Sequence, residues 1–329
     1  MRIENLTTLL NGELKNSPKI SMINGFCLDP NLVKVGMAYF ALNATIEDAL
    51  LAIKSGAYAI ITDLSLNSKD DEIAIIKVDS VVMAMIRLMR FLSAQKELNF
   101  IHLTKLQSSI LECLYRPKSL CLLSCDLNQA FMQIIEADNN AYIMSIDETM
   151  IDKLSFSCSS LNDDSLSDLH YNLIDNGSLF YTTILFKGNY YSDLKFPNIF
   201  IKDLVNIMSF FDRCGVGFRI NNFEAFSHFR AIFVDRFFNI QEFGQSHRAI
   251  ICESDEELFR FEASNLRAKF DDVIICVKAG SSVAFMADFI YKDISEIKKL
   301  GEFRYALILE NFESLEAILT QDIKEPTLF

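Results

Sequence analysis

The residues that could carry acid–base, nucleophilic or metal chemistry are few, and they are scattered along the 329-residue sequence. The four histidines form no pair at the spacing of two metal ligands: His102, His170, His228 and His247. Cys121 and Cys125 are four residues apart, but a zinc site normally needs four ligands and the sequence offers no second pair. We therefore predict no structural metal, and we interpret His102 as a core residue of a strand.

Other reactive side chains have simpler structural explanations. Ser246-His247 could suggest a nucleophile and a base, yet no G-x-S-x-G elbow surrounds the pair. The acidic run at residues 253–257, which begins with Glu253, stands before a predicted helix, where negative charge is favourable. Residues 70–72 are acidic and typical of a solvated turn. The sequence thus indicates no catalytic residue.

A glycine-rich phosphate-binding loop is also missing. In such a loop glycines let backbone N–H groups converge on a phosphate, Lys neutralises the terminal phosphates, and Ser or Thr binds Mg²⁺. The chain has 11 glycines, none lies between Gly56 and Gly177, and no G-x-x-x-x-G-K-[ST] pattern occurs. The single Gly-x-Gly, at Gly215 and Gly217, lacks the third glycine of a dinucleotide fingerprint and ends a helical pattern.

Composition narrows the class of protein. Half of the residues are hydrophobic and the mean hydropathy is +0.20, which is enough for packed cores, and the length favours two or three domains. The net charge of -13 argues against a nucleic-acid partner. No apolar run approaches the roughly 20 residues that span a bilayer, and the first residues lack the apolar core of a signal peptide. The eight scattered cysteines are typical of reduced thiols, so we expect a cytoplasmic protein.

Residues 20–63 carry the clearest pattern of secondary structure. Residues 39–42 and 58–61 are apolar runs typical of buried strands, and residues 48–54 have apolar side chains at helical spacing. Gly56 stands where this helix must end. A longer helix, ending at Gln95, follows the next extended segment. This order predicts a small sheet covered by helices.

The same stretch resembles the N-terminal, UDP-recognising domain of the Mur ligases, the cytoplasmic enzymes that add amino acids to the peptidoglycan precursor. The residues that match the family pattern are Asp29, Val33, Gly36, Tyr39 (Phe in the family), Ala41, Gly56 and Ala57. Pro30 and Asn31 replace a Ser and an Arg of the family, and residues 43–45 replace an Asp-Gly-His segment. The resemblance implies a degenerate substrate-binding site, made of Asp29, Asn31, Asn43 and Thr45.

The resemblance extends to the strand predicted at residues 99–103. In the Mur ligases the equivalent strand runs into a phosphate-binding loop of the pattern Thr-Gly-Thr-x-Gly-Lys-Thr. Here Lys105 stands at the first Gly, Ser108 at the second and Ser109 at the Lys. The resemblance therefore implies that the loop has been lost, and that Thr104, Lys105, Ser108 and Ser109 occupy former phosphate-loop positions.

We predict an α/β protein with a three-domain Mur-ligase-like architecture. Residues 1–95 form the N-terminal-like domain, residues 96–223 a reduced central α/β domain, and residues 224–329 a Rossmann-like C-terminal domain with a parallel sheet. In the last domain predicted strands alternate with helices, at residues 248–252, 254–269, 272–277, 281–299, 305–309 and 312–319. Ser254 and Glu257 have capping-box spacing at the start of the first of these helices.

Two functional hypotheses follow from the resemblance. The preferred one is a non-catalytic Mur-ligase-like protein with a structural, binding or regulatory role in cell-wall synthesis, with protein partners in that process or in division and with no cofactor. The alternative is an active ATP-dependent ligase that adds an amino acid or D-Ala-D-Ala to UDP-N-acetylmuramoyl-peptide and needs ATP and Mg²⁺. A third possibility is that the C-terminal domain binds another small ligand, although the sequence has no fingerprint for one.

Overall fold

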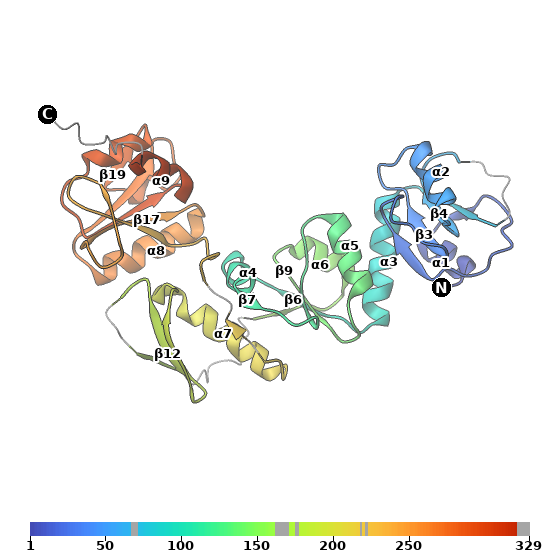
Figure 1. Ribbon diagram of the computed structural model, residues 1–329, viewed down its shortest axis with the longest axis horizontal. Helices are drawn as coiled ribbons and strands as arrows, with labels where there is room; N and C mark the ends of the chain where they lie inside the picture. Colours follow the sequence, from blue (N-terminus) through green and yellow to red (C-terminus); the bar gives the residue numbers. More distant parts are fainter. Residues whose placement is uncertain (67–71, 162–170, 175–177, 218, 221–222, 321–329) are drawn as a thin grey trace. The chain divides into compact units, whose positions relative to one another are not determined.

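The computed structural model describes residues 1–66, 72–161, 171–174, 178–217, 219–220 and 223–320 (Figure 1). The chain forms two compact units, one of residues 1–108 and 116–165 and one of residues 109–115 and 166–329, and we describe each by itself. The predicted domain boundaries near residues 95 and 223 stay a prediction. His170, Asp70 and Asp71 lie outside the described residues. Within the described ranges no helix is both long and apolar enough to cross a bilayer.

The first layer of unit 1 is a five-stranded sheet with the strand order β1-β5-β4-β3-β2. Strands β2 to β5 are parallel and β1 is antiparallel to β5. Its elements are α1 (Ile3–Leu10), β1 (Glu13–Leu14), β2 (Gly25–Cys27), β3 (Met37–Phe40), α2 (Ile46–Lys54), β4 (Ala59–Thr62), β5 (Ala74–Lys77) and α3 (Val81–Gln95). Neighbouring side chains of β3 face opposite sides, so Tyr39 packs beneath α2 and Phe40 packs toward α3. The predicted helix that ends at Gln95 is confirmed.

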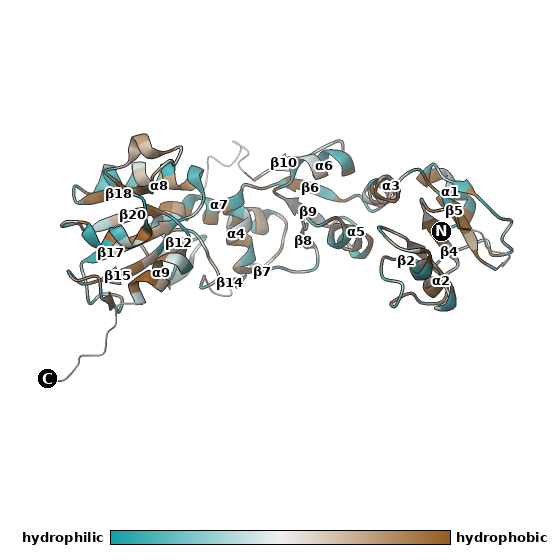
Figure 2. Ribbon diagram, turned by 90° about the horizontal axis from the view of Figure 1, so that it is seen from above, coloured by the Kyte–Doolittle hydropathy of each residue, from teal (hydrophilic) through white to brown (hydrophobic). Residues whose placement is uncertain are grey.

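The second layer of unit 1 is a parallel sheet with the strand order β10-β6-β9-β8. Its elements are β6 (Asn99–His102), the start of α4 (Lys105–Glu112), β8 (Leu120–Leu122), α5 (Leu127–Glu136), β9 (Tyr142–Ser145), α6 (Glu148–Leu154) and β10 (Ser159–Ser160). Residues 109–112 of α4 belong to unit 2. Helix α3 lies between the two sheets, with β5 on one side and α5 and α6 on the other (Figure 2). One hydrophobic core runs across α3, and the rings of Phe40 and Phe131 meet at 5.0 Å. The two sheets therefore fold around a common helix.

Unit 2 is built on a six-stranded sheet with the strand order β16-β15-β17-β20-β18-β19. Strands β17, β20 and β18 are parallel, as predicted, β19 is parallel to β18, and β15 and β16 add an antiparallel edge. Its elements are β15 (Arg230–Val234), β16 (Ile240–Gln241), β17 (Arg248–Glu253), α8 (Glu256–Lys269), β18 (Val273–Lys278), β19 (Phe289–Tyr291), β20 (Tyr305–Leu309) and α9 (Phe312–Thr320). The α/β class is thus confirmed.

The rest of unit 2 precedes this sheet in the chain. Strands β11 (Tyr171–Ile174), β12 (Thr182–Phe186) and β13 (Asn189–Leu194) form an antiparallel sheet, followed by a 3-10 turn (Asn198–Phe200) and α7 (Ile201–Arg213). A short ladder joins β7 (Leu114–Tyr115) to β14 (Arg219–Ile220). Phenylalanine rings fill the space beside α7, where Phe196 contacts Phe223 at 4.7 Å and Phe226 at 5.1 Å.

Two predicted details of unit 2 are wrong. Residues 281–299 form no continuous helix, because residues 289–291 are strand β19, with 3-10 turns at Ala284–Met286 and Ile294–Lys299. The apolar run at residues 289–291 pairs with β18 and completes the sheet, which outweighs its weak helical pattern. The cap of α8 is Asp255, whose side chain accepts hydrogen bonds from the backbone N–H groups of Glu257 and Leu258, and Ser254 is exposed before it. Asp is as good an N-cap as Ser and stands one residue closer to the helix.

Candidate functional site

The connection between β6 and α4 contains the former phosphate-loop positions that the resemblance implies. Only Leu103 and Thr104 lie between the end of β6 and the start of α4. The Thr104 hydroxyl accepts a hydrogen bond from the backbone N–H of Gln107 (3.2 Å), and the Gln107 side-chain oxygen accepts one from the backbone N–H of Thr104 (3.1 Å). This reciprocal pair is a capping box, and it occupies amides that a phosphate at this helix end would need.

The residues at the former phosphate-loop positions have separate environments. Thr104 caps α4, Lys105 is exposed in its first turn, and Ser108 and Ser109 are half-buried within the helix. The backbone N–H of Ser108 donates to the Thr104 carbonyl oxygen at 3.0 Å, as in an ordinary helix. The Ser109 hydroxyl is hydrogen-bonded to His228 at 3.1 Å. The origin of these four positions in a phosphate loop stays a prediction.

The predicted substrate-binding residues of unit 1 are engaged within their own loops. Asp29 Oδ1 accepts hydrogen bonds from the backbone N–H (2.8 Å) and the side-chain amide (3.1 Å) of Asn31. Thr45 is the N-cap of α2, where its hydroxyl accepts from the Asp48 N–H (3.2 Å) and its own N–H donates to the Asp48 carboxylate (2.8 Å). Asn43 adopts a left-handed conformation with φ 50°. These contacts shape the loops, and the binding role of the four residues stays a prediction.

Tyr39 couples these two loops electrostatically. Its side chain is 2% exposed on β3. Burial raises the pKa of Tyr39 to about 12, with further contributions from the carboxylates of Asp48 and Asp29. Because the carboxylates of Asp48 and Asp29 both raise the pKa of Tyr39, an anionic ligand bound beside Tyr39 would be repelled by two negative charges.

Unit 2 contains a hydrogen-bonded series of side chains that the sequence patterns did not predict. His228 Nε2 is 3.1 Å from Ser109 Oγ, and His228 Nδ1 is 3.0 Å from Glu253 Oε1. The three residues come from α4, the segment before β15, and the end of β17. They lie 119 and 25 residues apart in the sequence, so no local motif marks them. We call Ser109, His228 and Glu253 the relay.

Glu253 is the anchor of the relay. It is 1% exposed, and its Oε1 accepts hydrogen bonds from the backbone N–H groups of Ser254 and Asp255, both at 2.8 Å. Its Oε2 accepts a longer bond from the Phe229 N–H at 3.4 Å. These donors fix the orientation of the Glu253 side chain. The sequence analysis interpreted Glu253 only as favourable charge before a helix, and it did not predict that this side chain is buried.

A second buried carboxyl group lies beside Glu253. Glu262, on α8, is 0% exposed. Burial raises its pKa well above the usual range, and the neighbouring Glu253 carboxylate raises it further. Because burial and the neighbouring carboxyl group both disfavour charge on Glu262, we expect Glu262 to hold its proton.

The other sequence candidates have structural roles in the described part of the chain. The Ser246 hydroxyl donates to the Val234 carbonyl oxygen (2.6 Å) and accepts from the Arg248 N–H, and His247 is exposed. His102 is half-buried at the end of β6. The described residues include no group of three or more His, Cys, Asp or Glu side chains that could hold a metal ion.

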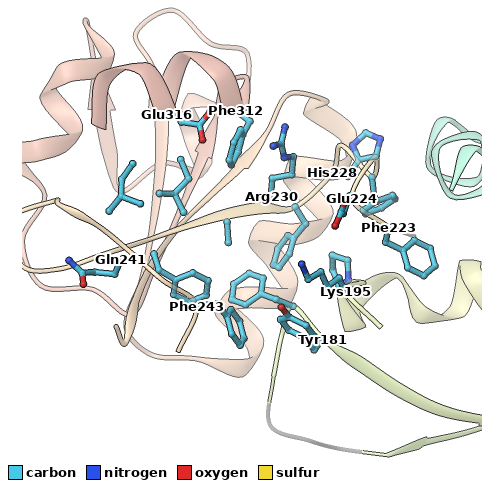
Figure 3. A pocket seen from close by; sticks show the side chains of 18 residues that line it. Tyr181, Lys195, Phe223, Glu224, His228, Arg230, Gln241, Phe243, Phe312 and Glu316 are labelled. Atoms are coloured by element: carbon cyan, nitrogen blue, oxygen red, sulfur yellow. The ribbon is translucent and has the colours of Figure 1, made fainter. Parts of the chain in front are cut away.

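A pocket of about 460 Å³ opens beside the relay in unit 2. His228 and Arg230 line it, and in the view of Figure 3 they lie at the opposite end from Gln241. Its other walls are largely aromatic, and ring contacts join them: Phe180 to Phe233 at 5.4 Å, Phe233 to Phe243 at 5.1 Å, and Tyr181 to Phe243 at 4.6 Å. The volume and lining are those of a small-molecule site.

Arg230 is held in place at the edge of this pocket. Its guanidinium lies 3.5 Å above the ring of Phe312 and 3.2 Å from the carboxylate of Glu313. Lys195 and Glu224 also line the pocket, and both are exposed. The pocket thus offers an apolar surface and charged groups of both signs.

No family model and no curated protein matches the chain. Solved structures similar to it include a MurF ligase from Thermotoga maritima in complex with ADP, at 13% identity and a TM-score of 0.48, covering 91% of this chain and 98% of that one. MurF from Acinetobacter baumannii is similar at 11% identity and a TM-score of 0.46, covering 97% of this chain and 92% of that one. These structures are Mur ligases. At TM-scores below 0.5 and such identities, the similarity to Mur ligases says nothing about the chemistry of this chain.

Proposed function

We propose that the chain is a Mur-ligase-like protein that does not catalyse ATP-dependent ligation and has a structural, binding or regulatory role in peptidoglycan synthesis. The observation that carries the proposal is the two-residue connection between β6 and α4. The resemblance at residues 29–57 supports a relation to the ligases, and the short connection supports the loss of the loop on which their reaction depends. The role would be exerted in the cytoplasm through protein partners of cell-wall synthesis or division.

An ATP-dependent amide ligase must bind the terminal phosphates of ATP while a carboxylate attacks them. In a phosphate loop several backbone N–H groups and a Lys side chain surround these oxygens. Here Thr104 and Gln107 cap the helix instead, and Ser109 stands at the position of the Lys. Because Lys105 lies within the capping box of Thr104 and Gln107 and not in a glycine turn, it has no scaffold that would direct it to a phosphate.

The predicted substrate loops support the same proposal. An Arg offers a fixed fork of donors to an anionic ligand, whereas Asn31 offers one neutral amide, which is bonded to Asp29. Losing one charge-assisted contact costs roughly 1.5–3 kcal/mol, which weakens binding about tenfold to a hundredfold. The carboxylates of Asp29 and Asp48 near Tyr39 add repulsion toward a diphosphate.

Phosphate release and calorimetry test this proposal. The protein is incubated with ATP, Mg²⁺ and UDP-muramoyl-peptide, and we expect no phosphate above background and no micromolar binding of the UDP-peptide. Lys105→Ala should behave like the unmodified protein. Thermal shift with ATP and with the UDP-peptide separately provides a control for binding without turnover, because a ligand at about a hundred times its Kd adds roughly 2.7 kcal/mol.

Turnover that is abolished by Lys105→Ala would overturn the proposal and favour the active ligase. Micromolar binding of the UDP-peptide without turnover would keep the protein non-catalytic as a ligase but assign it to precursor binding.

A further inference from the structure

We propose that the relay is a catalytic site for acyl transfer, in which Ser109 is the nucleophile, His228 is the general base and Glu253 is the positioning residue. The substrate class is a carboxylic ester or thioester with a small apolar or aromatic acyl group. The activity needs no nucleotide. It goes beyond the function proposed above, and either one can fail while the other stands.

The hydrogen bonds around Glu253 fix the state of the His228 ring. The carboxylate of Glu253 can only accept, so His228 Nδ1, at 3.0 Å and 3.1 Å from its two oxygens, carries a proton and donates. In the neutral ring Nε2 is then the free lone pair, and the Ser109 hydroxyl at 3.1 Å donates to it. This tautomer is the one in which an imidazole can take the proton of a serine hydroxyl.

The anchor is fixed by its surroundings. Backbone N–H groups of Ser254 and Asp255 hold one oxygen of Glu253, and the protonated Glu262 next to it adds no second charge. A buried carboxylate whose lone pairs are taken by backbone donors has little freedom to rotate. His228, which is 9% exposed, is therefore held between a fixed acceptor and the serine.

The residues that line the pocket indicate the class of substrate. His228 lines it, so a bound molecule reaches the side chain to which Ser109 is bonded. Phe180, Phe233 and Phe243 provide the apolar surface for an acyl group. Lys195 and Arg230 line the same pocket, and positive charge there favours the anionic tetrahedral intermediate of acyl transfer.

Two half-reactions with water as the second reactant complete the chemistry. Ser109 Oγ bonds to the carbonyl carbon as its proton passes to His228 Nε2, and the bond to the leaving group breaks as that proton passes to the leaving oxygen or sulfur. Water then attacks the acyl-serine, its proton passes to Nε2, and the carbon–Oγ bond breaks as Ser109 regains the proton. The products are a carboxylic acid and an alcohol or thiol.

A fluorophosphonate probe tests the site in the full-length protein. An activated serine displaces fluoride from the probe and forms a stable phosphonate ester, so mass spectrometry of peptides locates the label. We expect one label per chain, on Ser109. Ser109→Ala should remove it, and His228→Ala should slow it about 100-fold or more, which is the usual contribution of a general base.

Matched variants separate chemistry from folding. Ser264 is also a helical serine, exposed and bonded to the Arg260 carbonyl, and Ser264→Ala should label like the unmodified protein. Glu253→Gln keeps the size of the side chain but replaces its charge. We expect Glu253→Gln to slow labelling at least about tenfold. Glu253→Asp, which keeps the charge, should slow labelling less, a pattern that a purely structural role would not give.

The main test is the labelling of Ser109 in the unmodified protein, so its result does not depend on whether a variant folds. Absence of label on Ser109 under conditions that label a serine hydrolase would overturn the proposal. So would labelling of Ser109 at an unchanged rate in a folded His228→Ala variant.

Discussion

Replacing Glu262 by Gln should change how the stability of unit 2 depends on pH. Glu262 is 0% exposed on α8, and burial and Glu253 raise its pKa well above the ordinary value of 4.5. Below pH 4.5 the group is protonated in both the folded and the unfolded chain, and its contribution to stability is fully present. Above pH 4.5 the unfolded chain releases the proton while the folded chain keeps it, so stability is lost until the pH passes the folded pKa.

The magnitude follows from the linkage relation. One proton held only by the folded state lowers the free energy of unfolding by about 1.4 kcal/mol per pH unit. The loss continues at this rate, about tenfold in the unfolding equilibrium for each pH unit, until the pH passes the folded pKa. Gln cannot ionise, and it has nearly the same size and shape as Glu. The free energy of unfolding of the Glu262→Gln variant should therefore rise relative to that of the unmodified protein by about 1.4 kcal/mol per pH unit, up to the folded pKa of Glu262.

Hydrogen–deuterium exchange of peptides from α8 and β17 measures this difference, because it reports the opening of unit 2 without the rest of the chain. The ratio of protection factors between variant and unmodified protein is compared at pH 5, 6 and 7, which cancels the intrinsic pH dependence of exchange. Glu257→Gln is the matched control, since Glu257 is an exposed carboxylate on the same helix. Parallel profiles for Glu262→Gln and the unmodified protein would refute the assignment of the proton to Glu262.

The local parts of the fold were predictable from the sequence. Helix α3 was predicted from apolar residues at helical spacing, and β3 and β4 from short apolar runs. The parallel strands of the C-terminal sheet followed from the alternation of strands and helices. The helix predicted at residues 281–299 was wrong because a three-residue strand such as β19 forms only through its pairing with β18. Patterns with so few residues are decided by tertiary contacts.

The relay could not be predicted from local patterns. Ser109 and His228 meet only because α4 and the segment before β15 lie together in unit 2. One signal was available, however. Glu262 falls at helical spacing between the apolar residues Phe259 and Leu266, so a carboxyl group had to be on the buried face of α8. An ionisable residue on an apolar stripe indicates an unusual buried environment, and the neighbouring acidic group there is Glu253.

Two substitutions in unit 1 test the local physics of the residues that resemble the Mur ligases. Thr45→Ala removes the side-chain cap of α2 and should lower the free energy of unfolding by about 1 kcal/mol in chemical denaturation, as expected for a lost N-cap. Gly56→Ala should cost more. Gly56 has φ +100°, and a Cβ there would lie 2.8 Å from Val35 Cγ2 and 3.1 Å from Val35 Cα. Such a backbone conformation costs of order 1–3 kcal/mol for a residue with a side chain, and the contact with the Val35 backbone can relax only if the turn moves. Ser55→Ala is the control, because Ser55 lies in the same turn with an ordinary helical φ of -76°. Exchange of peptides from residues 37–62 should show Gly56→Ala strongly deprotected and Ser55→Ala within about 0.5 kcal/mol of the unmodified protein; equal effects of the two would mean that Gly56 is not required by its conformation.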